Sequence, residues 1–219
     1  VKETMHKRYF QEMHAMKEAD LVFVLNYETK KNVEEQLGIA SDKIILIGNG
    51  VNTDVYYPLT DSEKESVKEK FNLTGKKILL QVGSVYENKG QAKAIEKLAP
   101  LLKSDSSLVY AFAGGIVSQE YYDSVISKAA ELGVANQVRY LGSFAPNKEM
   151  NGLYNVAHAT VFASEYEGFP LVCVESVSAG VPVIICSDIS VNIAGGCVMP
   201  LSKENVEKHY YPLLHERIT

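Results

Sequence analysis

The chain has 219 residues, of which 46% are hydrophobic and 22% are charged. This balance excludes an intrinsically disordered protein and fits one ordinary domain together with part of another. The 22 basic and 27 acidic residues give a formal net charge of −5, so the chain lacks the basic field with which proteins attract nucleic acids.

Short apolar runs alternate with helix-length segments along almost the whole chain. Several of these runs are apolar nearly from end to end, as is typical of strands that are covered on both faces. The sequence therefore predicts an α/β fold, a Rossmann-like parallel sheet with helices on both faces. We expect strands at 21–25, 43–47, 77–82, 108–113, 137–141, 159–163 and 182–185, and helices at 28–37, 61–71, 90–102, 118–132, 147–157, 171–179 and 203–217.

The segment 48–60 is rich in turn-forming residues and has no helix or strand period, so we expect an interdomain hinge there. Before it, residues 1–47 offer only two helices and two strands, which rarely make a stable sheet alone. We interpret them as the tail end of a missing N-terminal domain. Residues 61–201 are expected to form one complete domain, followed by a C-terminal helix over 202–219.

The compartment is suggested by the cysteines and by the absence of targeting signals. Cys173, Cys186 and Cys197 lie in apolar runs without a CxxC pair, which favours buried thiols over disulfides or metal ligands. No stretch approaches the roughly 18–20 apolar residues of a membrane span, and no signal peptide opens the chain. We therefore expect a cytoplasmic protein.

Residues 82–90, which read VGSVYENKG, connect an expected strand to an expected helix. In open parallel sheets, ligands bind at the carboxyl ends of strands and beside helix N-termini. Gly83 permits a close approach of the backbone, the loop amides can face an anion, and Lys89 adds a positive charge. Taken alone, an ordinary turn with a solvated lysine explains the segment better, so an anion site is the alternative.

Residues 141–146, which read LGSFAP, follow a second strand. The backbone at Ser143 could meet the edge of a nucleotide base, and Phe144 could form an apolar wall beside it. Without further context, a turn with Phe144 in the core is the simpler interpretation.

Residues 163–175, which read ASEYEGFPLVCVE, contain a strand end, an acidic loop and the start of a helix. A carboxylate can accept two hydroxyl hydrogen bonds at once, as a sugar or ribose requires. Favourable interaction of an acid with a helix N-terminus, about 0.3–1 kcal/mol, accounts acceptably for Glu167. It accounts poorly for Glu175, because a carboxylate embedded among apolar residues needs a partner.

At these residues the chain resembles the retaining, nucleotide-sugar-dependent glycosyltransferases of the GT-B fold, group 1 type. Their two glutamates stand in the pattern EGFGxxxxE, and residues 167–175 read EGFPLVCVE. Residues 47–54, 83–90 and 179–184 are similar to the family's IxNGVD, GRxxxxKG and AxGxPVI motifs. The four motifs occur in family order, which makes the combination far more specific than any one of them.

The resemblance implies roles for individual residues. Lys89 would hold the donor's diphosphate and stabilise the charge that grows on the leaving group, and Glu175 would bind the ribose hydroxyls. Glu167, together with the backbone amides of Gly168, Phe169 and Leu171, would bind hydroxyls of the transferred sugar. Lys89 and Glu167 are thus the expected catalytic residues. The expected donor-binding residues are Gly83, Ser84, Lys89, Ser143, Phe144, Glu167, Gly168, Phe169, Leu171 and Glu175.

The implied reaction transfers a sugar, with retained anomeric configuration, from a nucleotide diphosphate sugar to an acceptor. No metal or other cofactor is implied, because the lysine and helix amides take the part of Mg²⁺. The expected partners are the donor, the missing N-terminal domain, which would decide any membrane association, and, as an alternative, a second copy bound through residues 1–47. The base, sugar, acceptor and linkage stay open, with polysaccharide, glycolipid and small metabolites all conceivable.

Two departures from the family pattern bear on activity. Ser84 stands where the family has an arginine, and a lost charge-assisted hydrogen bond is worth about 1.5–3 kcal/mol, or roughly ten- to a hundredfold in affinity. Pro170 replaces a glycine and removes one amide donor near the sugar. We expect weak donor binding and little transfer by this chain alone. A degenerate, non-catalytic module is the main alternative, and a nucleotide-sugar epimerase is another that the glutamate spacing disfavours.

Overall fold

The computed structural model describes residues 2–47, 49–186 and 198–200, and it divides the chain into two compact units, residues 1–50 and 51–219. The division falls within the segment 48–60 that was expected to be a hinge. The expected C-terminal helix and Cys197 lie outside the described residues. Within the described part, no helix is long and apolar enough to cross a membrane.

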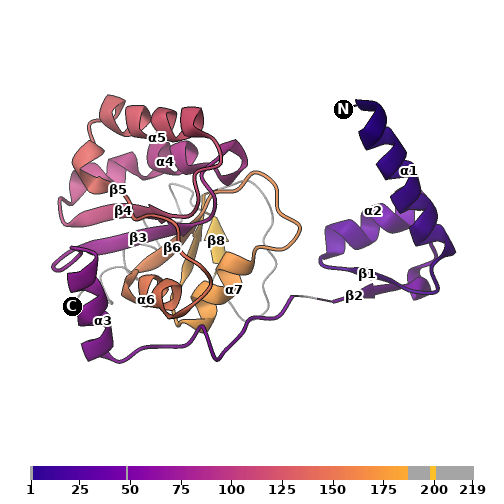
Figure 1. Ribbon diagram of the computed structural model, residues 1–219, viewed down its shortest axis with the longest axis horizontal. Coiled ribbons are helices and arrows are strands. Elements are labelled where there is room, and N and C mark those ends of the chain that lie inside the picture. The colour runs from indigo at the N-terminus through magenta and orange to yellow at the C-terminus, as the bar shows by residue number, and fades with distance from the viewer. Residues whose placement is uncertain (1, 48, 187–197, 201–219) are drawn as a thin grey trace. The chain divides into compact units, whose positions relative to one another are not determined.

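The second unit is built around a parallel sheet with the strand order β5-β4-β3-β6-β7-β8 (Figure 1). The chain starts in the middle of the sheet at β3, adds strands toward β5, then returns to the other side of β3 with β6. Every described neighbouring pair is parallel. The strands are β3 (Lys77–Val82), β4 (Leu108–Ala113), β5 (Val138–Tyr140), β6 (Ala159–Phe162), β7 (Val183–Ile185) and β8 (Val198–Pro200).

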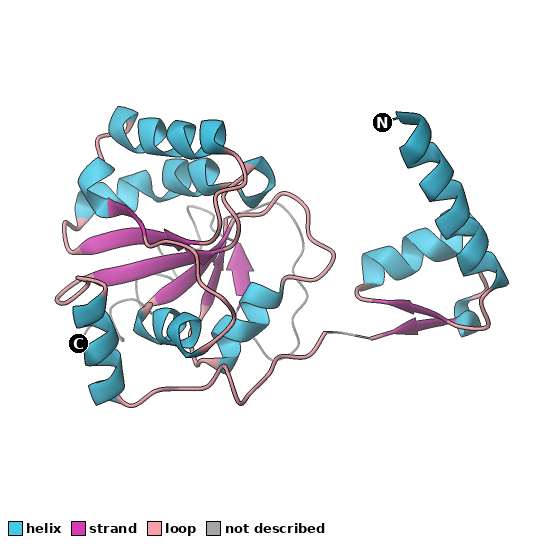
Figure 2. Ribbon diagram, viewed as in Figure 1, coloured by secondary structure: helices cyan, strands magenta, loops and turns pink. Residues whose placement is uncertain are grey.

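Helices cover both faces of this sheet, which confirms the predicted fold class (Figure 2). One face carries α4 (Gln91–Ser104) and α5 (Gln119–Glu131), and the other carries α3 (Asp61–Lys70), α6 (Lys148–Val156) and α7 (Leu171–Ser178). The side chains of β3 and β4 alternate between two cores. Leu79 and Tyr110 belong to the core under α4 and α5, whereas Ile78 and Val109 belong to the core under α3 and α6.

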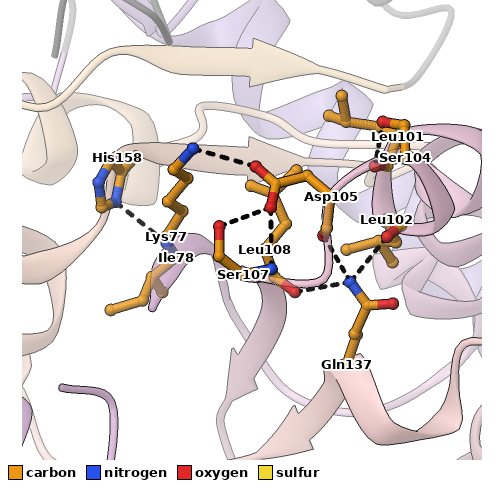
Figure 3. Close-up of polar contacts among 10 residues, drawn as sticks. All are labelled: Lys77, Ile78, Leu101, Leu102, Ser104, Asp105, Ser107, Leu108, Gln137 and His158. Carbon is orange, nitrogen blue, oxygen red and sulfur yellow. Dashed lines mark hydrogen bonds and ion pairs between the residues drawn. The ribbon is translucent and has the colours of Figure 1, made fainter. Parts of the chain in front are cut away.

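The amino edge of the sheet is closed by a cluster of satisfied polar groups (Figure 3). Gln137 donates from Nε2 to the carbonyls of Leu102, Asp105 and Leu108 at 2.7, 2.9 and 2.9 Å. The Asp105 carboxylate accepts from Ser107 and pairs with Lys77 at 3.0 Å, and these contacts lower its pKa to about 2. Gln137 ends a 3₁₀ helix, so β5 is shorter than the expected strand 137–141.

The first unit consists of α1 (Lys2–Glu18), β1 (Val22–Val24), α2 (Tyr27–Leu37) and β2 (Ile44–Leu46), with β1 and β2 parallel. One face of this pair is covered, since Val22, Val24 and Ile44 are buried in its small core. The opposite face is not covered in the described chain, because Phe23 and Ile45 expose 62% and 40% of their surface. Both faces of these strands are therefore apolar, but only one of them is buried.

Candidate functional site

The carboxyl edge of the second unit's sheet brings together the loops that the sequence singled out. The strand order reverses between β3 and β6, and such switch points are where open α/β sheets bind ligands. The loops after β3 and β4 continue the parallel pairing, with the amide of Gly83 donating to Ala113 at 2.9 Å and the amide of Val85 to Gly115 at 2.8 Å. A Cβ on Gly114 would lie 2.1 Å from the Gly83 carbonyl oxygen, so only glycine permits this approach.

A pocket of about 380 Å³ opens at this edge. The loops after β3, β4 and β5, the segment before α3, and helices α6 and α7 contribute to its wall, and five of the expected donor-binding residues line it. Phe144 had been expected either to form an apolar wall or to lie in the core, and it does both. It lines the pocket and also packs edge-on against Phe71, with ring centroids 5.6 Å apart. The lining consists of Tyr56, Val82, Gly83, Ser84, Ala113, Gly114, Gly115, Ser143, Phe144, Pro146, Met150 and Glu175.

Glu175 reaches the pocket from α7 and is held by two tyrosines. The buried Tyr154 hydroxyl donates to Glu175 Oε2 at 2.7 Å. Tyr56 packs edge-on against Tyr154, with centroids 5.7 Å apart. Burial, and then the neighbouring Glu175 carboxylate, raise the pKa of both phenols, which therefore remain neutral donors. The half-buried carboxylate thus has the partners that its apolar sequence context required.

Lys89 and Glu167 form an ion pair beside this pocket. Their side chains are only 21% and 19% exposed, so the pair is sheltered from solvent. Glu167 Oε1 also accepts from the Ser164 hydroxyl at 3.0 Å. The lysine stem lies over Gly83, since a Cβ on that glycine would be 3.5 Å from Lys89 Cδ. The pair therefore adjoins the pocket at the wall that Gly83 forms.

Five expected residues do not line the pocket. Lys89 and Glu167 pair beside it, and Gly168, Phe169 and Leu171 lie outside its lining. The amide of Leu171, expected to face a sugar hydroxyl, donates instead to the Phe169 carbonyl at 3.0 Å. Helix α7 begins at Leu171 after Pro170, which caps it without a side-chain hydrogen bond. The pocket therefore includes Glu175 of α7 but not the first residue of that helix.

The segment before α3 is attached to the second unit and carries one wall of the pocket. The Tyr57 and Leu59 amides donate to the side-chain oxygens of Asn151 and Asn155 at 3.2 and 2.7 Å. Ser178 donates to the Tyr56 carbonyl at 2.6 Å. These contacts seat Tyr56 next to Glu175, a neighbour that the sequence did not predict.

The cysteines and acidic groups add no further site. Cys173 and Cys186 are buried, unpaired thiols, as the sequence predicted for them. Burial raises the pKa of both, that of Cys186 to about 12. Throughout residues 2–47, 49–186 and 198–200, no three His, Cys, Asp or Glu side chains cluster in a way that could hold a metal ion.

Comparison with protein families gives a match over residues 62–192 to the family described as "Glycosyl transferases group 1". A D-inositol 3-phosphate glycosyltransferase of Corynebacterium aurimucosum is 28% identical over 177 residues, covering 79% of this chain and 42% of that protein. The O-antigen chain mannosyltransferase B of Escherichia coli is 26% identical over 175 residues, covering 78% and 44%. The chain thus spans less than half the length of these relatives.

Solved structures with this fold include HepE of Anabaena in complex with UDP, with a TM-score of 0.76 at 19% identity over 93% of this chain and 55% of that one. The sucrose-phosphate synthase of Thermosynechococcus elongatus gives 0.76 at 20% identity over 97% and 53%. A C-terminal domain of a group 1 glycosyl transferase from Francisella tularensis gives 0.61 at 22% identity over 77% and 90%.

Proposed function

The chain belongs to the glycosyl transferases group 1 family, and we propose that it supplies the donor-binding half of an enzyme that moves a sugar from a nucleotide diphosphate sugar to an acceptor. One observation carries the proposal. A single pocket at the switch point of the sheet joins Glu175, Ser143 and Phe144 to Gly83 and Ser84, with the Lys89–Glu167 pair at its wall. Its volume of about 380 Å³ lies within the usual range for small-molecule sites.

The end of the pocket proposed to bind the donor's nucleoside lies between Glu175 and the Ser143–Phe144 loop. A carboxylate offers about four acceptor positions, so the hydrogen bond from Tyr154 leaves capacity for the vicinal hydroxyls of a ribose. Tyr154 donates to one oxygen and thereby fixes the carboxylate's direction. Phe144 and the backbone around Gly115 give the apolar wall against which a base can lie.

The end of the site proposed to bind the donor's diphosphate and sugar lies at Lys89 and Glu167. Transfer breaks the bond between the anomeric carbon and a diphosphate oxygen, and the departing oxygen takes the bonding electrons. A lysine beside that oxygen stabilises the transition state more than the ground state, which is the requirement for catalysis. Glu167, already an acceptor from Ser164, would accept hydroxyls of the transferred sugar. Retention of configuration rests on the family resemblance.

The apolar face of the first unit belongs to the same proposal. Phe23 and Ile45 are exposed although parallel sheets are ordinarily buried on both faces. We propose that the remainder of an N-terminal domain, which would carry the acceptor site, covers this face in the whole enzyme. The 42–44% coverage of the relatives' length supports this view. Sedimentation equilibrium separates it from a homodimer, because self-association through this face would be lost in a Phe23→Glu, Ile45→Glu variant.

A degenerate module that binds nucleotide sugars without transfer is the second candidate. It is favoured by Ser84 at the family's arginine position and by the neutralisation of Lys89 by Glu167. Restoring the cation separates the two functions, since Ser84→Arg should strengthen diphosphate binding about tenfold where a weakened donor site exists. No gain would favour the degenerate module.

The first test is a calorimetric titration of the chain with UDP, GDP, ADP and their sugar conjugates, in the presence and absence of EDTA. UDP is the first choice, because a structure of similar fold holds it. We expect weak, EDTA-insensitive binding of one nucleotide, lost in both Lys89→Ala and Glu175→Ala. Absence of binding to every nucleotide at millimolar concentration would contradict an independent donor site.

A further inference from the structure

Two loops meet where Lys89 and Glu167 pair. We call residues 83–90 the lysine loop and residues 163–170 the glutamate loop. The side chain of Asn88 donates from Nδ2 to the Tyr166 carbonyl at 3.0 Å and accepts from the Tyr166 amide at 3.1 Å. The Glu165 amide donates to the Asn88 carbonyl at 2.9 Å. Asn88 thus pairs with the glutamate loop through both its side chain and its backbone.

A second contact fixes the same two loops at their bases. Gly90 has φ +66°, and a Cβ built there would lie 2.3 Å from the Ala163 carbonyl oxygen. The two backbones therefore touch, and only glycine permits both the conformation and the approach. Below them, the buried Gln81 donates from Nε2 to the Lys89 carbonyl at 2.6 Å and accepts from Tyr110 at 2.6 Å. The backbone of Lys89 is consequently anchored to the sheet.

The requirement for asparagine follows from the geometry of this pairing. Asn88 satisfies both the amide and the carbonyl of one residue, Tyr166, which takes a donor and an acceptor on the same short side chain. Aspartate lacks the donor, and alanine lacks both. Tyr166 is one residue from Glu167, and Asn88 is one residue from Lys89, so the pairing acts directly on the two charged groups.

We propose that Asn88 is a positioning residue that clamps the lysine and glutamate loops together and so sets the separation between the Lys89 ammonium and the Glu167 carboxylate. The effect of this clamp on donor binding rests on the proposed function, in which the two groups bind the diphosphate and the sugar of one donor. A rigid separation lets both contacts form without a further loss of loop freedom.

The experiment compares Asn88→Ala with Asn136→Ala, an exposed asparagine at the amino edge of the sheet. The measured quantity is the ratio of affinities for a nucleoside diphosphate and the monophosphate of the same base. We expect Asn88→Ala to weaken diphosphate binding about tenfold and monophosphate binding less than twofold, since only the former reaches Lys89. Equal weakening of both would leave the ratio unchanged and indicate general structural damage, which would overturn the positioning role. No change in either affinity would overturn it as well.

A second measurement does not depend on nucleotide binding. Hydrogen–deuterium exchange should become at least about tenfold faster at the Glu165 and Tyr166 amides in Asn88→Ala, while exchange within β3 and α4 stays as in the parent chain. Unchanged exchange at those amides would overturn the clamp outright. If the parent chain binds no nucleotide and the exchange still rises, the proposed function fails whereas the clamp holds.

Discussion

The two edges of the second unit's sheet use their polar groups in opposite ways. At the amino edge, Gln137, Asp105 and Lys77 bond to the protein itself and close the ends of β3, β4 and β5 (Figure 3). At the carboxyl edge, Lys89 and Glu167 pair with one another beside an open pocket, and Glu167 also accepts from Ser164. Substitutions at the amino edge should therefore change stability, whereas those at the carboxyl edge should change ligand affinity.

Gly90 is the strongest exception to this division between stability and affinity, because it lies at the carboxyl edge but should contribute to stability. Gly90→Ala should lower the free energy of unfolding by about 3 kcal/mol, from left-handed strain and from the clash with Ala163. The matched control is Gly133→Ala, with φ +69° and no neighbour within 4 Å, where about 1 kcal/mol is expected. Urea unfolding measures both, and equal losses would refute the close contact of the two loops.

A sharper case at the amino edge is Gln137→Ala. The change removes the donor shared by three carbonyls and should cost about 2 kcal/mol of unfolding free energy while leaving nucleotide affinity unchanged. Gln119→Ala, which removes an exposed hydrogen bond to Asp123, serves as control with an expected loss below about 0.5 kcal/mol. A change in affinity without a change in stability would reverse the roles of the two edges.

At the carboxyl edge, Glu167→Gln should strengthen the binding of a nucleoside diphosphate about three- to tenfold. The substitution frees Lys89 from its ion pair and removes a negative charge that repels the diphosphate. The same variant should lose any preference for the sugar conjugate. Glu165→Gln makes an equal charge change at an exposed position of the same loop, and an equal gain there would show that only net charge matters.

The smallest effect is a pH dependence from Asp105. Its folded pKa, about 2, lies below the ordinary value of 3.8, so its contribution is present above about pH 4 and is lost as the pH falls toward 2. Because the carboxylate is partly exposed, we expect Asp105→Asn to cost only about 1 kcal/mol at pH 7, a difference that disappears by pH 2. Urea unfolding at several pH values measures it, and a pH-independent difference would contradict this account.

The fold could be predicted from the sequence because each buried strand repeats the same local signal. Runs such as Leu108–Ala113 are apolar on both faces, and the helices between them have suitable lengths. Local patterns also located the loops that carry Lys89 and Phe144 and the helix that carries Glu175. The spacing of the motif residues could not indicate which side chains from other parts of the chain contact the site. Tyr154 bonds to a residue 21 positions away and Asn88 to one 78 positions away, and such pairings appear only once the chain has folded.

The predicted strands of the first unit show the other limit of local patterns. Residues 21–25 and 43–47 were expected to be strands and are apolar on both faces, yet one face of β1 and β2 is exposed in the described chain. An apolar run predicts that a surface is buried, but it does not identify the element or the chain that buries it.

The attachment of Tyr56, Tyr57 and Leu59 to α6 and α7 has a practical consequence for dissecting the protein. A recombinant fragment that starts at α3 would have a plausible boundary by sequence, but it would lack the tyrosine beside Glu175 and leave Asn151 and Asn155 without these partners. A fragment that starts at Val51 keeps them. Tyr56 therefore belongs to the second unit together with Val51 and Val55, and the tyrosine wall of the pocket is kept in any fragment that includes these residues.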